Sequence, residues 1–442
     1  MRPQALGNGI VTSVSPPSLR PGLATAVAVS LLLGTSGRAE DWPQWRGPNR
    51  DGVWHETGIL EAFPRGGLKV RWRVPVGPGW SSPVIAAERV YLTDSQLMRP
   101  KAKERVLCFA EATGKPLWTY AYEVHYPEWA FTPGQETGPS ATPLVEAGKV
   151  YALGPNGHLH CLDARTGGLL WQKRLDQEYQ LQEGWCRPSP LIEGNLLVLF
   201  IGGKPGACVL ALDKNSGKEV WKALNESVTN SSPLVITAGG KRQLIVWTQE
   251  SVTALDPATG KVYWRERMVT SNNDAIASPV FHKDLLLISG LMLKLDAAKP
   301  AASVLWPGTK PVARRILSNT STPLLRGNYV FSARSSGELV CLEAGTGKEV
   351  WKTDKVTDLK GGASIHLTPQ GDAVFLYTNK GELIRAKLTP QGYQEISRVA
   401  LLEPVYPFAG RKVNWSPPAY ANRHVFARNE KELISASLSA KP

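Results

Sequence analysis

Side chains that could bind a ligand recur three residues before a series of Ser/Thr-Pro steps in the sequence. Their types are aromatic, amide, hydroxyl, aliphatic and guanidinium: Trp80, Ser140, Arg187, Asn230, Ile276, Thr320 and Asn414. Neighbouring positions add Trp185, Asn273, Asp274, Arg315, Asn319 and Trp415. Such groups converging on one site suit a planar or carbohydrate-like ligand, or the edge of a peptide. The same groups could instead cap strand ends and hold water, so the pattern leaves both interpretations open.

A second candidate is the aromatic stretch between Trp118 and Pro143, which is too long for a simple connection. It carries five aromatic side chains, Tyr120, Tyr122, Tyr126, Trp129 and Phe131. A projecting loop with exposed Tyr126 and Trp129 predicts contact with a protein or a glycan. The alternative is a loop that folds back and buries these rings over a central funnel.

No set of residues predicts catalysis or a metal site. His158 and His160 alternate on one predicted strand face, but no third ligand lies nearby, which favours histidines of the core or surface. The sequence has no nucleophile elbow, phosphate loop, zinc signature or dinucleotide fingerprint. We therefore predict no catalytic residue and no metal ligand.

The elements that position the candidate residues follow from a repeat. Tryptophans recur at positions 72, 118, 171, 221, 264, 306 and 351, a period typical of propeller blades. Ser/Thr-Pro steps run in phase at Pro83, Pro143, Pro190, Pro233, Pro279, Pro323 and Pro417. The stretch "GASIHL" around Ser364 stands where one further proline is due, so the chain holds eight units.

The motif "DPATGKVYW", Asp256 to Trp264, explains what each unit builds. Asp256 can accept hydrogen bonds from the turn, and Gly260 supplies the positive φ that the turn needs. The tryptophan can fill the wedge between neighbouring sheets. Each unit then has four strands, which predicts an all-β fold, an eight-bladed β-propeller of four-stranded antiparallel blades. The strand at 68–76 should complete the last blade and close the ring.

The recurrent D-x-x-T-G-K-x-x-W motif with its Ser/Thr-Pro phasing resembles the pyrroloquinoline-quinone-like (PQQ-like) propeller repeat, over roughly residues 68–439. The opening "DWPQWRGPNRDGV" at 41–53 resembles exported PQQ-like repeat proteins of planctomycete-type bacteria. The repeat is shared by quinoprotein alcohol and sugar dehydrogenases and by the BamB-like propeller of the outer-membrane assembly machinery. The resemblance therefore implies a fold shared by an enzyme class and a binding class.

Two departures favour the binding class. The dehydrogenases carry adjacent cysteines over the quinone, whereas this chain has no Cys-Cys pair, and they tend to be longer. We therefore expect a non-enzymatic scaffold without a cofactor that binds a protein partner or a cell-envelope glycan. The alternative is a PQQ/Ca²⁺-dependent alcohol or sugar dehydrogenase.

The N-terminus predicts export. Arg20 precedes the apolar run "PGLATAVAVSLLLG", and small residues follow up to Ala39, which is the layout of a secretory signal. We expect a signal peptide at 1–39, cleaved or kept as an anchor, an extension at 40–67 and the propeller at 68–442. The product would be periplasmic or secreted. Because the first cysteine is Cys108, a lipid anchor near the cut is disfavoured.

The charge balance is basic, with 51 Lys and Arg against 38 Asp and Glu. The basic residues are scattered, with the densest clusters at 101–105 and at Arg314-Arg315, and no basic stripe carries interleaved stacking aromatics. We therefore predict no nucleic-acid partner. No later run of eighteen apolar residues exists, so we predict no membrane span after the signal segment. We also expect the propeller to be a monomer.

Overall fold

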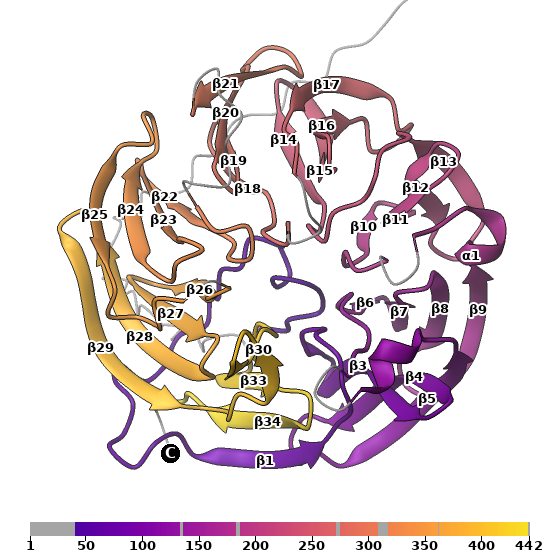
Figure 1. The fold of residues 1–442 in the computed structure, drawn as a ribbon, viewed down its shortest axis with the longest axis horizontal. Helices are drawn as coiled ribbons and strands as arrows, with labels where there is room; N and C mark the ends of the chain where they lie inside the picture. The colour runs from indigo at the N-terminus through magenta and orange to yellow at the C-terminus, as the bar shows by residue number, and fades with distance from the viewer. Residues whose placement is uncertain are drawn as a thin grey trace, which may run out of the picture. The chain divides into compact units, whose positions relative to one another are not determined.

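The computed structural model describes residues 40–132, 136–182, 186–270, 275–307, 317–360 and 362–440. Within these residues the strands form eight four-stranded sheets and one two-stranded hairpin. The sheets follow one another around a ring in chain order (Figure 1). The predicted eight-bladed antiparallel propeller is thus confirmed.

The strands of the first four blades keep the order of the chain. Blade 1 holds β2 (Val84–Ala86), β3 (Arg89–Met98), β4 (Lys101–Ala110) and β5 (Pro116–Val124); blade 2 holds β6 (Leu144–Glu146), β7 (Lys149–Leu153), β8 (His158–Asp163) and β9 (Leu169–Arg174). Blade 3 holds β10 (Leu191–Glu193), β11 (Leu196–Gly203), β12 (Ala207–Asp213) and β13 (Glu219–Ala223); blade 4 holds β14 (Leu234–Ala238), β15 (Lys241–Trp247), β16 (Ser251–Leu255) and β17 (Val262–Arg267). Two one-turn helices lie between blades, η1 (Glu128–Phe131) and α1 (Leu175–Glu178).

The second half of the ring repeats this order. Blade 5 holds β18 (Val280–His282), β19 (Leu285–Ile288), β20 (Leu291–Leu295) and β21 (Ala302–Trp306); blade 6 holds β22 (Leu324–Arg326), β23 (Tyr329–Ala333), β24 (Leu339–Glu343) and β25 (Glu349–Thr353). Blade 7 holds β26 (Ile365–Gln370), β27 (Ala373–Thr378), β28 (Glu382–Thr389) and β29 (Gly392–Ala400), and the hairpin β30 (Tyr406–Phe408) and β31 (Arg411–Val413) follows it. Blade 8 holds β32 (Ala419–Ala421), β33 (His424–Arg428), β34 (Glu432–Ser437) and β1 (Val70–Pro75).

The ring closes as predicted, because the N-terminal strand completes the last blade. β1 pairs antiparallel with β34, from Val70 opposite Ala436 to Pro75 opposite Glu432. This pairing covers the edge that β34 would otherwise expose. The two ends of the propeller sequence are thereby joined by backbone hydrogen bonds.

The repeated tryptophans fill the wedges between blades, as predicted. Five of the seven rings lie on the turn glycine of the following blade: Trp72 on Gly114, Trp118 on Gly167, Trp171 on Gly217, Trp221 on Gly260 and Trp306 on Gly347. A Cβ at Gly260, where φ is +73°, would lie 2.6 Å from the Trp221 ring. The indole of Trp221 also donates to the carbonyl oxygen of Pro257, at 3.1 Å. The motif is therefore structural at the junctions where it occurs.

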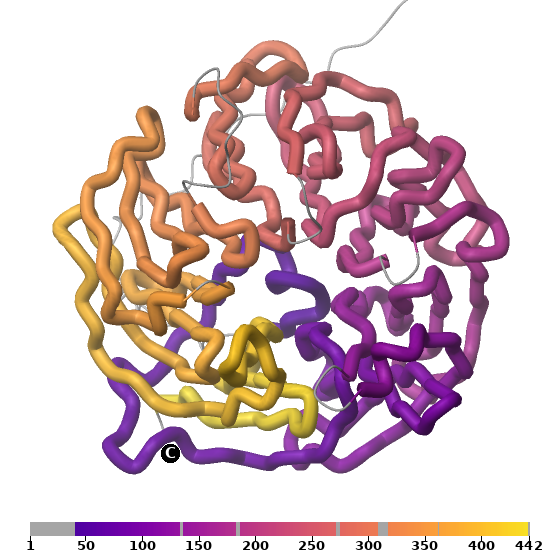
Figure 2. Tube along the Cα trace, in the orientation of Figure 1, coloured from indigo at the N-terminus to yellow at the C-terminus, as the bar shows by residue number. Residues whose placement is uncertain are grey.

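Residues 40–67, which we call the N-terminal strap, run across the centre of the ring (Figure 2). Trp42 pairs with Ile85 of blade 1 through two backbone hydrogen bonds of 2.9 Å. Arg50 donates to the carbonyl oxygens of Pro190 and Pro233, which open the innermost strands of blades 3 and 4. Trp54 donates its backbone N–H to blade 7. The strap therefore ties distant blades together at their inner ends.

Blade 1 departs from the sequence-based expectation. The stretch after Trp118 was expected to be a loop, but β5 continues to Val124 and places Tyr120 and Tyr122 in a strand. β3, β4 and β5 are nine or ten residues long, so blade 1 extends beyond the regular blades.

All five cysteines are buried and free, so Cys186 and Cys208 do not form a bridge. No helix in the described ranges has the length and apolar character to cross a membrane.

Candidate functional site

A cavity of about 490 Å³ opens at the centre of the ring, and we call it the funnel. It lies at the inner ends of the connections that run from the outer strand of one blade to the inner strand of the next. Its walls are formed by Trp45, Trp80, Ser140, Arg187, Ser189, Asn230, Ser232, Ile276, Asn319, Thr320, Thr322, Ser335, Gly362, Ser364, His366, Phe408, Trp415 and Pro417. Nearly every blade junction therefore contributes to one site.

Aromatic rings occupy the side of the funnel next to blade 8. The centroids of Trp80 and Trp415 are 6.3 Å apart, and Tyr406 lies 5.4 Å and 5.2 Å from these two rings. Phe408, from the β30–β31 hairpin, lies 4.9 Å from Trp415 in an edge-to-face contact. The indole N–H of Trp80 donates to Glu430, at 3.1 Å. These contacts fix the rings relative to one another.

Polar groups occupy the other side, and one of them, Arg187, reaches the aromatic side. The guanidinium of Arg187 lies over the face of Trp80, 5.6 Å from its centroid. Asn319 accepts a hydrogen bond of 2.6 Å from Ser289, and its backbone oxygen accepts from the N–H groups of Ile276 and Ala277. The amide is therefore held at the wall between blades 5 and 6. Tertiary hydrogen bonds position this side, just as ring packing positions the aromatic side.

A ring of hydroxyls underlies the polar side. At four junctions the residue before the repeated proline donates its N–H to the equivalent hydroxyl of the next blade, all at 3.0 Å: Ser82 to Thr142, Thr142 to Ser189, Ser189 to Ser232, and Ser278 to Thr322. This explains the Ser/Thr of each Ser/Thr-Pro step, because proline has no N–H and the preceding residue supplies both donor and acceptor. The step thus links neighbouring blades at the funnel wall.

Trp45 of the N-terminal strap forms the floor of the funnel. Its indole N–H donates to Ser278 of the blade 5 junction, at 2.9 Å. Beneath it lies a space of only about 30 Å³, lined by Trp42, Trp45 and Arg46 among others. The funnel is therefore closed at the strap and open on the other side.

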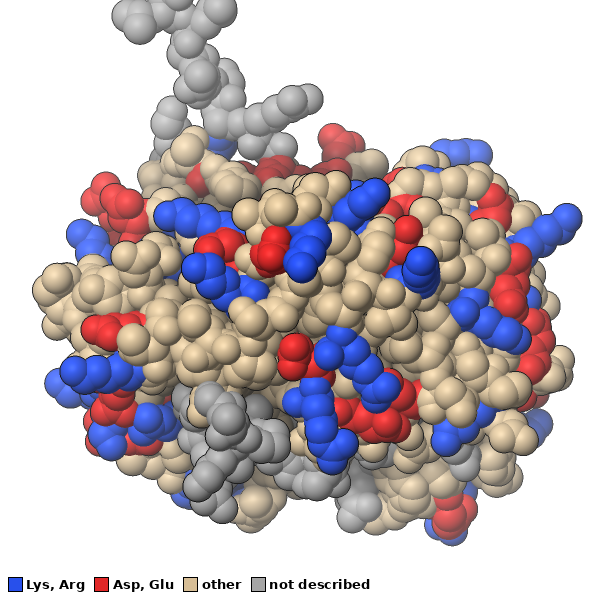
Figure 3. All heavy atoms as spheres, turned by 90° about the horizontal axis from the view of Figure 1, so that it is seen from above, with Lys and Arg blue, Asp and Glu red and all other residues tan. Residues whose placement is uncertain are grey.

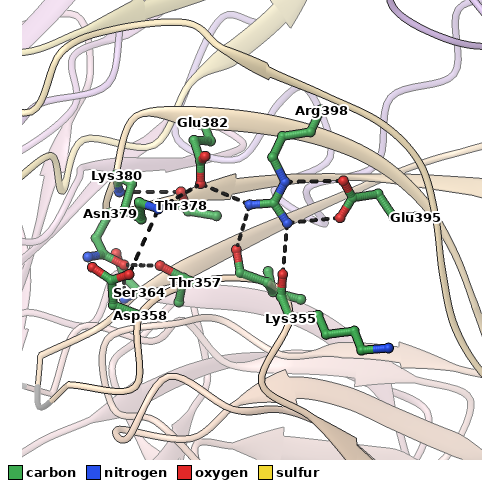
Figure 4. Close-up of polar contacts among 11 residues, drawn as sticks. Lys355, Thr357, Asp358, Ser364, Thr378, Asn379, Lys380, Glu382, Glu395 and Arg398 are labelled. Carbon is green, nitrogen blue, oxygen red and sulfur yellow. Dashed lines mark hydrogen bonds and ion pairs between the residues drawn. The ribbon is translucent and has the colours of Figure 1, made fainter.

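The connection from blade 6 to blade 7, residues 354–364, is held by blade 7 (Figure 4). Arg398 donates to the backbone oxygens of Lys355 and Val356, at 2.8 Å and 3.1 Å, and pairs with Glu382 and Glu395. The amide oxygen of Asn379 accepts from Thr357 at 2.9 Å. This network places Gly362 and Ser364 at the funnel wall.

The electrostatics of the funnel are simple. Arg187 is the sole Lys or Arg among the lining residues that the structure describes, and none of them is Asp or Glu. Burial lowers the pKa of His366 to about 4, so that imidazole is neutral at pH 7. On the side of the molecule drawn in Figure 3, Lys and Arg side chains are interspersed with Asp and Glu.

Eight of the candidate residues named from the sequence meet in the funnel: Trp80, Ser140, Arg187, Asn230, Ile276, Asn319, Thr320 and Trp415. Asn414 lies beside them but is fully buried, and its amide donates to Tyr377 and to the Arg428 carbonyl oxygen. Trp185, Asn273 and Asp274 lie outside the described residues, as does Arg315.

Tyr126 and Trp129 both lie in the connection after β5, apart from the funnel lining. Tyr126 is buried against Ala102 and Ala130, and its hydroxyl donates to Glu104 at 2.8 Å. Trp129, in η1, is half exposed. Of the two aromatic side chains, only Trp129 offers an accessible contact surface.

Sequence analysis missed Trp45, His366 and Phe408. Trp45 belongs to the "PQWRGP" stretch ahead of the first repeat, and Phe408 lies in an insertion between blades, so neither has an equivalent position in other units. The one feature of the sequence that sets these two residues apart is that they lie outside the repeated units. His366 follows Ser364 by two residues on β26, and that spacing could have placed it at the wall.

The alternative cofactors, PQQ and Ca²⁺, require oxygen ligands for the ion and cationic groups for the carboxylates of the quinone. The funnel lining offers no carboxylate and one guanidinium within the described ranges. No group of three or more His, Cys, Asp or Glu there could hold a metal ion. The described residues therefore do not fit this cofactor pair.

Fold and funnel together define a PQQ-like eight-bladed propeller with a central cavity closed at one end. The family described as outer membrane protein assembly factor BamB matches residues 102–306 and 298–391, and the chain belongs to this family. A BamB from Burkholderia pseudomallei is 28% identical over 51% of this chain and 58% of its own length. The quinoprotein alcohol dehydrogenase PedH of Pseudomonas putida is 26% identical over 41% of this chain and 30% of its own length. The chain thus matches less than two thirds of either relative.

Two solved structures share the fold. BamB from Moraxella catarrhalis has a TM-score of 0.57 at 18% identity, covering 84% of this chain and 97% of that one. The quinohemoprotein alcohol dehydrogenase of Comamonas testosteroni has a TM-score of 0.61 at 15% identity, covering 91% and 81%. At these identities the likeness concerns the fold, which a binding class and an enzyme class share.

Proposed function

We propose that this protein is an exported, non-enzymatic scaffold that holds a protein partner on the face around the funnel mouth. Export rests on the signal-like segment at 1–39, which lies outside the described residues and stays a prediction. The periplasm, or the medium after secretion, is then the place where the scaffold acts.

The main support for this proposal is the position of the exposed apolar side chains. Three of them stand on connections between blades and one ends strand β3, each 47% to 53% exposed: Trp129, Val269 and Leu359, with Met98 of β3, which we call the docking face. Ile276 and Phe408 add apolar surface at the funnel wall. The other large apolar side chains found exposed within the described ranges lie on β1 and on outer strands of blades 1 to 6. Apolar side chains exposed on connections between blades support a protein contact with those connections.

The name of the relatives points in the same direction. Several are called outer membrane protein assembly factor, which supports a partner that takes part in building the cell envelope. A rigid ring with variable loops on one face suits such a role, because the loops contact the partner while the blades keep their geometry.

Photo-crosslinking from defined positions tests this proposal. We would place a photoreactive phenylalanine analogue at Trp129 and at Leu359 in the full chain, and irradiate cells that produce it. The expected result is one protein adduct of the same mass from both positions. The matched control is Val220, which is 52% exposed on the outer strand β13, away from the docking face.

No adduct from either docking position, or an adduct from Val220 alone, would contradict the proposal. A partner bound at the rim of the ring would give the second outcome. The docking face would then have to be explained by another ligand.

The second candidate is a PQQ/Ca²⁺-dependent alcohol or sugar dehydrogenase. It is favoured by the quinoprotein relatives, such as the PedH enzyme. It is opposed by the lining of the funnel, where the described residues offer no ligand set for the ion. We therefore favour the scaffold function over this enzymatic function.

A further inference from the structure

The funnel has two chemically different halves. Its rings Trp80, Phe408 and Trp415 all come from the two connections that flank blade 8. The facing wall, built by junctions between blades 1 and 7, is mostly polar: Ser140, Arg187, Ser189, Asn230, Ser232, Asn319, Thr320, Thr322, Ser335 and Ser364. A ligand that fills the cavity therefore meets aromatic surface on one side and amides and hydroxyls on the other.

The charge of the lining limits the ligand further. Within the described residues the lining carries one guanidinium and no carboxylate, and His366 is neutral at pH 7. A polyanion or a dication would leave most of its charge uncompensated in this cavity. The lining instead suits an almost neutral ligand with many hydrogen-bonding groups.

We propose that the funnel binds a hexopyranose unit of a glycan. A pyranose ring presents a C–H face that can pack on an indole or phenyl ring, and its rim carries hydroxyls that both donate and accept. The hydroxyls would meet the amides of Asn230 and Asn319 and the Ser/Thr side chains of the same wall. A single amino-acid side chain from a protein would satisfy few of those groups, which favours the sugar.

The closed floor adds a second property, recognition of a chain end. Trp45 blocks the strap side of the cavity, with its indole bonded to Ser278. A linear polymer cannot pass through a funnel that is closed at one end. The sugar therefore enters with a terminal unit first, and the rest of the glycan leaves through the mouth.

This inference does not depend on the protein partner, so purified full-length protein is enough to test it. The probes are maltose, cellobiose and chitobiose at about 10 mM, above the millimolar dissociation constants expected of weak ligands. Binding is read by saturation-transfer difference NMR and by tryptophan fluorescence. We expect at least one disaccharide to bind, with transfer strongest at the protons of one ring face.

Four variants locate the sugar. Phe408→Ala should remove one packing surface and weaken binding at least tenfold, whereas Phe408→Tyr keeps an aromatic face and should retain binding. Asn230→Ala should also weaken it tenfold. Leu170→Ala, at a half-exposed position on the outer strand β9, is the matched control and should leave binding unchanged.

End recognition is tested with longer oligomers of the linkage that binds. Affinity per chain should stay the same as the oligomer grows, because each chain offers one such end. Affinity that rises with the number of units would overturn end recognition.

Three results would overturn the glycan site itself. They are no transfer from any of the three disaccharides, binding that the Phe408 and Asn230 variants leave unchanged, and complete displacement of the sugar by the dipeptide glycyl-tryptophan at lower concentration. The last result would assign the funnel to a protein side chain instead.

Discussion

The outer and inner radii of this propeller are built in opposite ways. At the outer radius one contact recurs, a tryptophan of one blade on the turn glycine of the next, as in Trp221 on Gly260. At the inner radius each junction presents a different side chain, from Trp80 to Arg187 to Asn230. Repetition therefore marks the scaffold, and departure from repetition marks the surface that is free to bind.

The largest effect is expected when one tryptophan between two blades is removed. Trp221→Ala deletes a buried ring and the hydrogen bond to the Pro257 carbonyl oxygen, so the free energy of unfolding should fall by about 3–5 kcal/mol. Urea unfolding followed by circular dichroism measures it. The matched control is Trp129→Ala on the docking face, which should change stability by less than about 0.5 kcal/mol. Equal losses in the two variants would break the comparison.

The closure between blades 8 and 1 adds a buried charge to the contact of Trp72 on Gly114. Arg428 is fully buried and donates to the backbone oxygens of Gly77, Thr93 and Asn429. Arg428→Met removes the guanidinium donor from Gly77 and Asn429, while Thr93 still accepts from the Ser81 hydroxyl, and should cost about 3 kcal/mol in thermal unfolding experiments. Arg428→Lys, which keeps the charge but not the planar fork, should recover little. Stability equal to wild type in the Met variant would mean that β1 pairing and the Trp72 contact close the ring without the buried charge.

The junction between blades 1 and 2 contains a buried carboxyl group that should make the stability of the protein depend on pH. Glu104 is buried there and accepts from Tyr122 and Tyr126, and burial raises its pKa to about 7. A raised pKa means that the folded state holds the proton more tightly than the unfolded state. The contribution of Glu104 to stability is therefore full below about pH 4.5 and falls, by at most about 3 kcal/mol, as pH rises to 7.

Glu104→Gln isolates this effect, since the amide keeps the size of the side chain and does not titrate. We expect the difference in unfolding free energy between pH 5 and pH 8 to shrink in the variant, measured by urea titration at both values. An unchanged difference would show that other groups cause the pH dependence.

The smallest effect concerns the turn glycines. Gly260→Ala forces a Cβ to 2.6 Å from Trp221 at a positive φ, whereas Gly327→Ala meets no atom within 4 Å at a similar φ. Both variants carry the backbone cost of about 1 kcal/mol, and only the first adds the clash, for a total of about 2 kcal/mol. The difference between the melting temperatures of the two variants measures the contact of Trp221 on Gly260. Equal melting temperatures would show that this contact does not limit the residue at position 260.

The repeat made most of the fold predictable from sequence. The spacing of the tryptophans and the Ser/Thr-Pro steps predicted eight four-stranded blades, and the terminal strand at 68–76 predicted closure through β1. The extension of β5 to Val124 was not predicted, because alternating residues after Trp118 lie where other units have a connection. A longer hairpin in one blade changes no repeat spacing before it.

The site was predictable in part. Comparison of equivalent positions found Trp80, Arg187, Asn230, Asn319 and Trp415, since all are fixed by their distance from a repeated proline. It could not find Trp45 or Phe408, which come from segments outside the repeat and reach the funnel through tertiary contacts such as the hydrogen bond to Ser278. It left open whether Tyr126 is exposed or buried, and the structure buries that ring against Ala102 and Ala130.

The most direct measurement is a calorimetric titration of the purified protein with PQQ, with and without Ca²⁺, at about 50 µM protein, where dissociation constants in the micromolar range are visible. The account of a scaffold whose funnel lacks a cofactor ligand set predicts no saturable heat under either condition. Saturable one-to-one binding that requires Ca²⁺ would contradict it and would make a quinoprotein dehydrogenase the better description.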